Sequence, residues 1–242
     1  RQLQMCIRDS FNSQGNPNLK PSDNYNLDLK WDFNPTPTEL ISLTAFYKLI
    51  KNPISRIEVA SAGGYLSYEN IADKATVAGV EIEIRKNLFV RPVSNAAHGM
   101  NKLSLGLNGS YIYTNAKMPL ATVTTGSQLE GAAPWIVNFD LSHNFTKGER
   151  SFVNTLVLNY VSDKIYTIGT QGYQDIMEQG VLTLDFVSQA KLNKHLSLNL
   201  KARNLLNPSY KLSRKANENG EKVILNDYKK GINISLGVSC TF

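Results

Sequence analysis

The chain has 242 residues, of which 42% are hydrophobic and 19% are charged, and its formal net charge is +6. Its lysines and arginines are scattered over turns and loops and form no single stripe or helix face, which argues against a nucleic-acid partner. The longest apolar candidate, residues 41–50, is interrupted by Ser42, Thr44 and Lys48, so no stretch reaches the roughly 18 apolar residues of a membrane-spanning helix. The composition suits a soluble protein and equally a transmembrane barrel, whose strands are apolar on one side only.

Alternation of apolar and polar residues predicts about nine β-strands and no amphipathic helix. Successive side chains on a strand point to opposite faces, so each of these segments has one apolar wall and one polar wall. The parity of residues 152–161 is ambiguous. In chain order the predicted strands are 25–33, 41–49, 75–85, 103–113, 135–145, 152–161, 182–189, 196–203 and 231–242.

The last predicted strand, from Gly231 to Phe242, alternates without interruption. Its length is close to the roughly 9–11 residues with which a tilted strand crosses a bilayer. The sequence ends on Phe242, on the apolar side of this strand. We therefore expect an outer-membrane barrel strand that ends at the periplasmic interface, with the apolar residues Ile232, Ile234, Leu236, Val238, Cys240 and Phe242 facing lipid.

The connections between the predicted strands alternate in length. With the C-terminus in the periplasm, the connections 34–39, 146–151 and 192–195 lie on the inner side and are short. The connections 51–73, 115–133, 163–179 and 204–230 lie on the outer side and are long, as in bacterial outer-membrane barrels. Residues 86–102 break this rule, because they form an inner connection that is long. We expect an irregular insertion there, or a strand that ends elsewhere.

Aromatic residues cluster at the ends of the predicted strands, with Leu, Ile and Val between them. Two aromatic girdles are typical of outer-membrane barrels, although aromatics also favour strands in general. The sequence thus predicts an all-β, antiparallel up-and-down transmembrane β-barrel. The inner girdle comprises Trp31, Phe33, Phe145 and Phe242, and the outer girdle Tyr25, Tyr111, Tyr113, Trp135 and Tyr160.

Several short motifs follow one another in a family order from residue 15 to the end of the chain. They resemble the barrel signature of TonB-dependent outer-membrane receptors, and most closely the receptors of Bacteroidetes-type bacteria. Each motif is short and partly generic, but six in register are specific. The matching segments are 15–21 with 25–31, 43–48, 70–83, 131–135 and 201–207, and the terminal Phe242.

The resemblance implies an energised importer with a 22-stranded barrel, an N-terminal plug and a TonB box. Its substrate would be scarce or bulky: a ferric siderophore, haem, cobalamin or an oligosaccharide. Residues 15–242 match only about the last third of that plan, so we expect a partial barrel of about nine C-terminal strands. Residues 1–14 are set apart as uncertain. One hypothesis is a truncation or assembly artefact, because residues 5–10 have no strand parity and look like a translated library adapter.

The expected partners follow from the same resemblance. They are outer-membrane lipid, the protein's own plug and the TonB complex (both outside this chain), and the barrel-assembly machinery through Phe242. No cofactor, metal site or catalytic residue is predicted, since His98, His143 and His195 lack the spacing of a metal site. Ser110, Ser142 and His143 could suggest a lipase, but nothing orients a base towards a nucleophile. Two further hypotheses stay open: a plug-free porin-like or structural barrel, and a soluble β-sandwich binding module.

Charged residues on the inward parity have two interpretations, a hydrated and mutually paired lumen wall or a surface that holds the plug. Outer-loop groups could touch substrate or only pack their loops, and protease added to intact cells is expected to cut near Arg214 and Lys215. The inward charges are Asp28, Lys30, Asp32, Glu81, Glu83, Arg85, Asp140, Asp185, Lys201 and Arg203, and the outer-loop groups are Tyr65, Tyr68, Tyr166, Tyr173 and Gln174.

Overall fold

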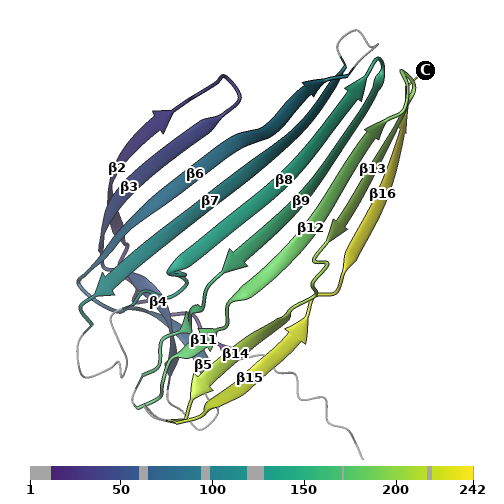
Figure 1. The fold of residues 1–242 in the computed structure, drawn as a ribbon. Helices are drawn as coiled ribbons and strands as arrows, with labels where there is room; N and C mark the ends of the chain where they lie inside the picture. The colour runs from purple at the N-terminus through teal and green to yellow at the C-terminus, as the bar shows by residue number, and fades with distance from the viewer. Residues whose placement is uncertain are drawn as a thin grey trace, which may run out of the picture.

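A computed structural model describes residues 12–59, 65–93, 99–118, 128–170, 172–216 and 220–241, and these residues form strands, turns and bends (Figure 1). Nine long strands make one continuous sheet in the order β16-β13-β12-β9-β8-β7-β6-β3-β2. Among the described residues, no helix has the length and hydropathy needed to cross a membrane. The nine strands are β2 (Asp23–Phe33), β3 (Leu40–Lys51), β6 (Lys74–Pro92), β7 (Met100–Ala116), β8 (Trp135–Lys147), β9 (Arg150–Val161), β12 (Val181–Lys191), β13 (Leu196–Arg203) and β16 (Asn233–Cys240).

All nine strands predicted from alternation are present, and the fold class is confirmed as all-β and antiparallel. Each long strand pairs with the next long strand along the chain, which is the up-and-down order that the sequence predicts. The sheet is twisted and is not closed on itself, so β2 and β16 are its two edges (Figure 1). Figure 1 also shows the short turns gathered at one end of the sheet and the long excursions at the other.

One face of the sheet is apolar and exposed. Leu27, Leu29 and Leu236 are 71%, 74% and 70% exposed, although leucine is a residue that folded proteins usually bury. The register also removes the ambiguity of β9, because Leu156 pairs with Leu141 and therefore shares this face. An exposed apolar surface that spans a whole sheet marks a membrane or protein contact, since water would penalise it by about 25 cal/mol per Å². We call it the outward face and the opposite side the lumen wall.

The predicted aromatic positions lie on the outward face where the structure describes them. Trp31 stacks on Phe33 with ring centroids 6.1 Å apart, and Tyr111 lies 4.6 Å from Trp135. Cys240 is exposed on the same face, where it pairs with Leu196. The predicted inner-girdle and assembly residue Phe242, like residues 1–10 and His98, lies outside the described residues.

Of the two alternatives for residues 86–102, the structure supports a strand that ends elsewhere. Strand β6 continues to Pro92 and β7 begins at Met100, so the connection is 93–99, of which 94–98 lie outside the described residues. Leu88 is an extra residue between Asn87 and Phe89 in the pairing with β7. Such a β-bulge shifts the alternation by one residue, which made β6 seem to end early.

Seven short strands lie outside the main sheet, and six of them, all except β1, are in connections that the sequence predicts as long loops. They form a three-stranded sheet, β1-β5-β4, and a four-stranded sheet, β10-β11-β14-β15, both at the long-loop end of the main sheet (Figure 1). Residues 12–13, which lie in the segment set apart as uncertain, pair in parallel with β5. The strands are β1 (Asn12–Ser13), β4 (Ile54–Val59), β5 (Tyr65–Asn70), β10 (Lys164–Thr167), β11 (Ile176–Glu178), β14 (Ser209–Lys215) and β15 (Lys222–Lys229).

Gly79 provides a test of the packing within the main sheet. A Cβ at this position would lie 2.5 Å from the Tyr111 carbonyl oxygen and against the Phe46 ring, so the backbone would have to move. We expect Gly79→Ala to lower the temperature at which the complete receptor loses its fast, folded migration on gels. The control is Gly109→Ala, whose Cβ would meet only Ile82 at 3.7 Å. Equal transition temperatures for the two variants would contradict this packing.

Candidate functional site: the lumen wall and the outer loop unit

The middle of the lumen wall is polar and hydrogen-bonded across strands. Asn138 Nδ2 donates to Asn108 Oδ1 at 3.3 Å, and the hydroxyls of Ser142 and Thr155 are 3.1 Å apart. These side chains come from β7, β8 and β9, which are neighbours in the sheet. A polar interior wall is what a barrel with a hydrated or plugged lumen requires.

The predicted inward charges are only partly paired with one another. Lys30 lies 3.1 Å from Asp32, and Arg85 lies 2.6 Å from Glu83. Asp185 Oδ1 accepts a hydrogen bond from the Asn204 backbone N–H at 2.8 Å, but no ion pair involves it among the described residues.

Four other inward charges form two separate groups. Asp28 and Glu81, on β2 and β6, make no ion pair among the described residues, and both line a hollow of about 390 Å³. Lys201 and Arg203 lie on β13, near the other edge of the sheet, and are likewise without an ion pair in the described part. Of these four charges, the acidic pair lies near one edge, in a hollow that Lys48 also lines, and the basic pair lies near the other edge. These groups are free to meet charges of a body inside the lumen.

The short strands β4, β5, β10, β11, β14 and β15, together with the described residues 128–134, pack into what we call the outer loop unit. Ile57 of β4 and Ile168 form a parallel bridge, in which the Glu58 N–H donates to the Ile168 carbonyl at 3.0 Å. Ile57 is 3% exposed and Ile168 is fully buried. These contacts tie the first outer connection to the third, so the connections form one packed body.

Arg56 is the main polar link inside the outer loop unit. Its guanidinium lies 3.0 Å from Glu130 Oε1 and 3.9 Å from the centroid of the Tyr166 ring. It also donates to the Tyr166 carbonyl oxygen from Nη2 at 2.6 Å and from Nε at 3.0 Å. The planar guanidinium can form all these contacts together, which lysine cannot. One half-buried side chain thus holds three outer connections together.

A second arginine makes a similar link. Arg214 of β14 forms an ion pair with Glu58 of β4, and its guanidinium lies 5.3 Å from the centroid of the Tyr173 ring. The side chains of Arg214 and Glu58 are 17% and 13% exposed. Arg214 is therefore a poorer protease site than its place in a predicted loop indicates. Lys215, the last residue of β14, is exposed and is the better of the two.

The predicted outer-loop groups have different environments. Tyr166 and Tyr173 pack on the two arginines, which supports a structural role for their rings. Tyr65 is half-buried and Tyr68 is 42% exposed. Gln174 lines a cavity of about 190 Å³ together with Asp175, Met177, Ser213, Arg214, Lys215 and Lys222.

The segment 201–207, one of the motifs behind the family resemblance, forms a corner at the outer rim. Asn204 and Asn207 have φ angles of 57° and 43°, in the left-handed region that asparagine tolerates best after glycine. Asn204 Nδ2 donates to the Gly231 carbonyl at 2.7 Å, and the Gly231 N–H donates to Asn207 Oδ1 at 3.0 Å. The motif therefore sets the angle at which the β14–β15 hairpin leaves the β13–β16 pair (Figure 1).

The residues considered for catalysis are not brought together. The Ser142 side chain lies on the lumen wall, whereas His143 lies on the outward face and hydrogen-bonds Asn101 at 2.8 Å. His195 Nδ1 lies 2.7 Å from the Thr241 carbonyl oxygen in a short turn. In the part of the chain that the structure describes, no three His, Cys, Asp or Glu side chains could hold a metal ion.

The contacts of Arg56 should protect the outer loop unit from protease. We expect Arg56→Ala to speed trypsin cleavage of intact cells at Lys215 and Lys222 severalfold, because Glu130 and the Tyr166 carbonyl lose their shared donor. Arg56→Lys should restore only part of the protection. The matched control is Lys194→Ala, which removes an exposed pair with Glu149 in the short turns. Cleavage that is equally fast in the wild type and in Arg56→Ala would show that this link does not close the unit.

The rim corner gives a separate prediction. Asn204→Ala removes the hydrogen bond to Gly231 and places alanine at a positive φ, so we expect about 1–3 kcal/mol of local destabilisation. Asn204→Gly removes the same hydrogen bond without the backbone strain and should be the milder change. Hydrogen exchange of the β14–β15 hairpin in the complete receptor measures both. If the positive φ of residue 204 had no effect, Asn204→Gly would be at least as destabilising as Asn204→Ala, which would contradict this account.

Comparison with known proteins agrees with this architecture. The family model described as TonB dependent receptor-like, beta-barrel matches residues 6–205. No curated protein and no solved structure matches the chain. The match covers most of the chain and includes eight of the nine long strands, from β2 to β13. The chain therefore belongs to the TonB-dependent receptor-like β-barrel family.

Proposed function

We propose that this chain is barrel wall of an outer-membrane active transporter, which imports a scarce or bulky ligand with energy delivered through TonB. One observation carries the proposal: a chain of this family folds into an antiparallel sheet that is apolar on one face and polar on the other. Such a sheet separates lipid from a hydrated interior. A soluble β-sandwich would cover its apolar face with a second sheet, and the outward face has no cover among the described residues.

We propose that residues 15–242 are the C-terminal portion of a larger barrel of 22 strands. The open edges β2 and β16 support this, because unpaired backbone N–H and C=O groups find no partners in hydrocarbon. In a complete barrel, further strands would pair with both edges.

The lumen wall suggests how the protein's own plug would be held. Asp28 and Glu81 on one side, and Lys201 and Arg203 on the other, can pair with opposite charges on a body inside the barrel. The paired groups, such as Arg85 with Glu83, would remain part of the hydrated wall. The plug and the TonB complex are thus proposed partners that lie outside this chain.

In the proposed orientation the C-terminus is periplasmic and the outer loop unit is extracellular, which leaves Phe242 available to the barrel-assembly machinery. The difference in length between the connections at the two ends of the sheet supports this placement (Figure 1). The cavity beside Gln174 and Lys215 would then face the medium, where ligand arrives. We propose no catalytic role, and the ligand could be a siderophore complex, haem, cobalamin or an oligosaccharide.

Labelling of single cysteines tests the orientation. In a receptor whose other cysteines, including Cys240, are replaced by serine, we expect Lys215→Cys to react with a membrane-impermeant maleimide on intact cells. Lys194→Cys, in the short turn between β12 and β13, should react only after the outer membrane is opened. The reverse pattern would invert the proposed topology.

Uptake measurements test the transport mechanism even before the ligand is identified. Compounds that wild-type cells remove from the medium are compared by mass spectrometry with those removed by cells lacking the receptor or lacking TonB. We expect the same compounds to remain in both deletion cultures. Loss of uptake without the receptor, but normal uptake without TonB, would instead indicate a plug-free porin-like barrel.

A further inference from the structure

The outward face carries a band of polar side chains among its apolar residues. The band crosses five neighbouring strands, from β6 to β12. We call it the outer-face polar stripe, and its members are Arg91, Asn101, His143, Asn154 and Ser188. Register pairs Arg91 with Asn101, His143 with Asn154, and Asn154 with Ser188, which places them on one face.

Hydrogen bonds within the stripe are accepted by the side-chain amide oxygens of Asn101 and Asn154, and the amide nitrogens of these residues take no part in them. His143 Nε2 donates to Asn101 Oδ1 at 2.8 Å, and Ser188 Oγ donates to Asn154 Oδ1 at 2.7 Å. Among the described residues, neither Asn101 Nδ2 nor Asn154 Nδ2 has an acceptor. Each of these nitrogens carries two N–H donors. The stripe therefore presents unused donors to whatever lies against the outward face.

Arg91 adds positive charge to these donors. Its guanidinium lies 5.6 Å from the centroid of the Phe89 ring and has no ion pair among the described residues. No aspartate or glutamate belongs to the stripe. A ligand that complements the stripe must therefore supply both negative charge and hydrogen-bond acceptors.

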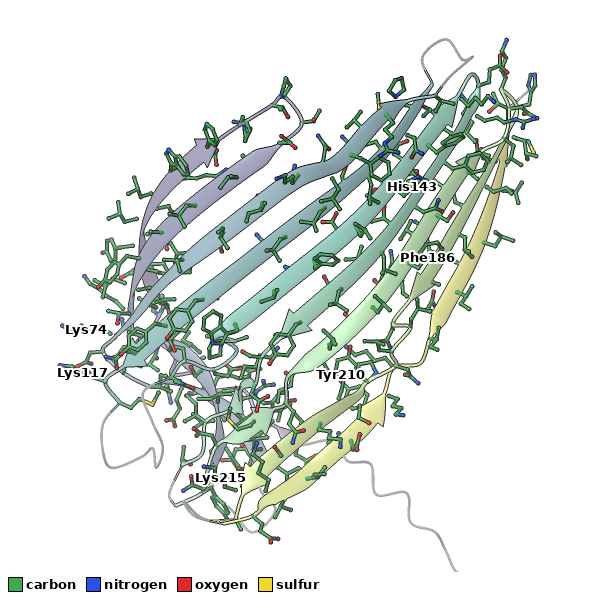
Figure 2. The ribbon with its side chains drawn as sticks, in the orientation of Figure 1. Lys74, Lys117, His143, Phe186, Tyr210 and Lys215 are labelled. Atoms are coloured by element: carbon green, nitrogen blue, oxygen red, sulfur yellow. The ribbon has the colours of Figure 1, made fainter. Side chains whose placement is uncertain are left out.

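The position of the stripe along the strands indicates its depth in the membrane. His143 is four residues before Lys147, the end of β8, and Asn154 is four after Arg150, the start of β9. With a rise of about 3.3 Å per residue and a tilt of about 45°, His143 and Asn154 lie about 9 Å from the short turns. Asn101, which pairs with Phe145, and Arg91, one residue before the end of β6, lie nearer to the strand ends. The Phe145 and Phe152 rings, 6.4 Å apart, lie between the His143–Asn154 pair and those turns. In Figure 2, His143 lies towards the short-turn end, and Tyr210 and Lys215 lie towards the other.

This depth corresponds to the boundary between lipid headgroups and acyl chains. Unpaired donors deeper in hydrocarbon would be costly, whereas a phosphodiester at the boundary supplies acceptor oxygens and a negative charge. Apolar residues such as Leu141 and Leu156 continue the outward face towards the membrane centre and can contact acyl chains.

We propose that the outer-face polar stripe binds the phosphate headgroup of an anionic phospholipid in the periplasmic leaflet. The inference rests on the proposed outer-membrane placement and orientation. The lipid phosphate accepts hydrogen bonds from Asn101 Nδ2 and Asn154 Nδ2 and pairs with Arg91. Its acyl chains follow the outward face between β7 and β12.

Native mass spectrometry of the complete receptor tests this proposal, with phosphatidylglycerol, phosphatidylcholine, lipid A and inorganic phosphate as separate probes. We expect the first phosphatidylglycerol to bind more tightly than phosphatidylcholine. Arg91→Leu combined with Asn154→Leu should weaken that binding fivefold or more, since one cation near the membrane surface contributes about that much. The matched control combines Lys102→Leu with Asn159→Leu, which likewise removes one cation and one asparagine, but from the lumen wall, and should leave the binding unchanged.

Arg91→Lys is a second variant that keeps the charge on an exposed residue and should retain most of the phosphatidylglycerol binding. Equal loss in the lumen-wall control, no preference over phosphatidylcholine, tighter binding of lipid A, or equivalent binding of inorganic phosphate would each overturn the proposal. Cysteine labelling distinguishes a failure of this inference from a failure of the proposed orientation. If Lys215→Cys and Lys194→Cys react as expected but the stripe shows no lipid preference, only this inference fails.

Discussion

The hydrogen bonding of the backbone in hydrocarbon is the constraint on which the rest of the structure depends. A strand in a membrane finds no water for its N–H and C=O groups, so they must bond to neighbouring strands. In the β2-to-β16 sheet every strand between the two edges pairs with a neighbour on both sides. Because side chains alternate along a strand, every second one faces lipid and the others face the lumen. This constraint explains the apolar outward face and the polar lumen wall. It also explains why irregular backbone is confined to the two ends of the sheet.

This constraint explains why the long strands could be predicted from the sequence. Every strand must repeat the same alternation over its full membrane-crossing length. The alternation of apolar and polar residues therefore recurs nine times along the sequence, which makes the strands easy to identify. The prediction from alternation is incomplete in two strands, β9 and β6, and each has a physical reason. In β9 both faces carry apolar residues, since Val153 and Val157 lie on the lumen wall and Leu156 and Leu158 face outward, so only register decides. In β6 the bulge at Leu88 shifts the parity midway.

The outer loop unit was beyond prediction because its contacts connect distant segments. Arg56 and Tyr166 are 110 residues apart in the sequence, and Glu58 and Arg214 are 156 residues apart. No local sequence pattern can therefore predict either contact. Strand β4 does carry a short alternation, in which Ser55 and Ile57 are buried and Ile54 is exposed, and it could have been read. The inward charges were predicted by parity, but which of them are paired depends on side-chain conformation along each strand, as in Lys30 with Asp32 and Arg85 with Glu83. The 201–207 motif was recognised as a signature, and only the structure shows that it builds a corner.

The tie between Ile57 and Ile168, together with the two arginine links, has a consequence for how such receptors can diversify. Outer connections that pack independently could be exchanged one at a time between relatives, as interchangeable parts. Here a foreign first connection would lack the groups that contact Ile168, Glu130 and Arg214, and would leave the half-buried Arg214 without its carboxylate. New recognition surfaces on this rim should therefore arise by concerted replacement of several connections, or by changes restricted to exposed positions such as Tyr68.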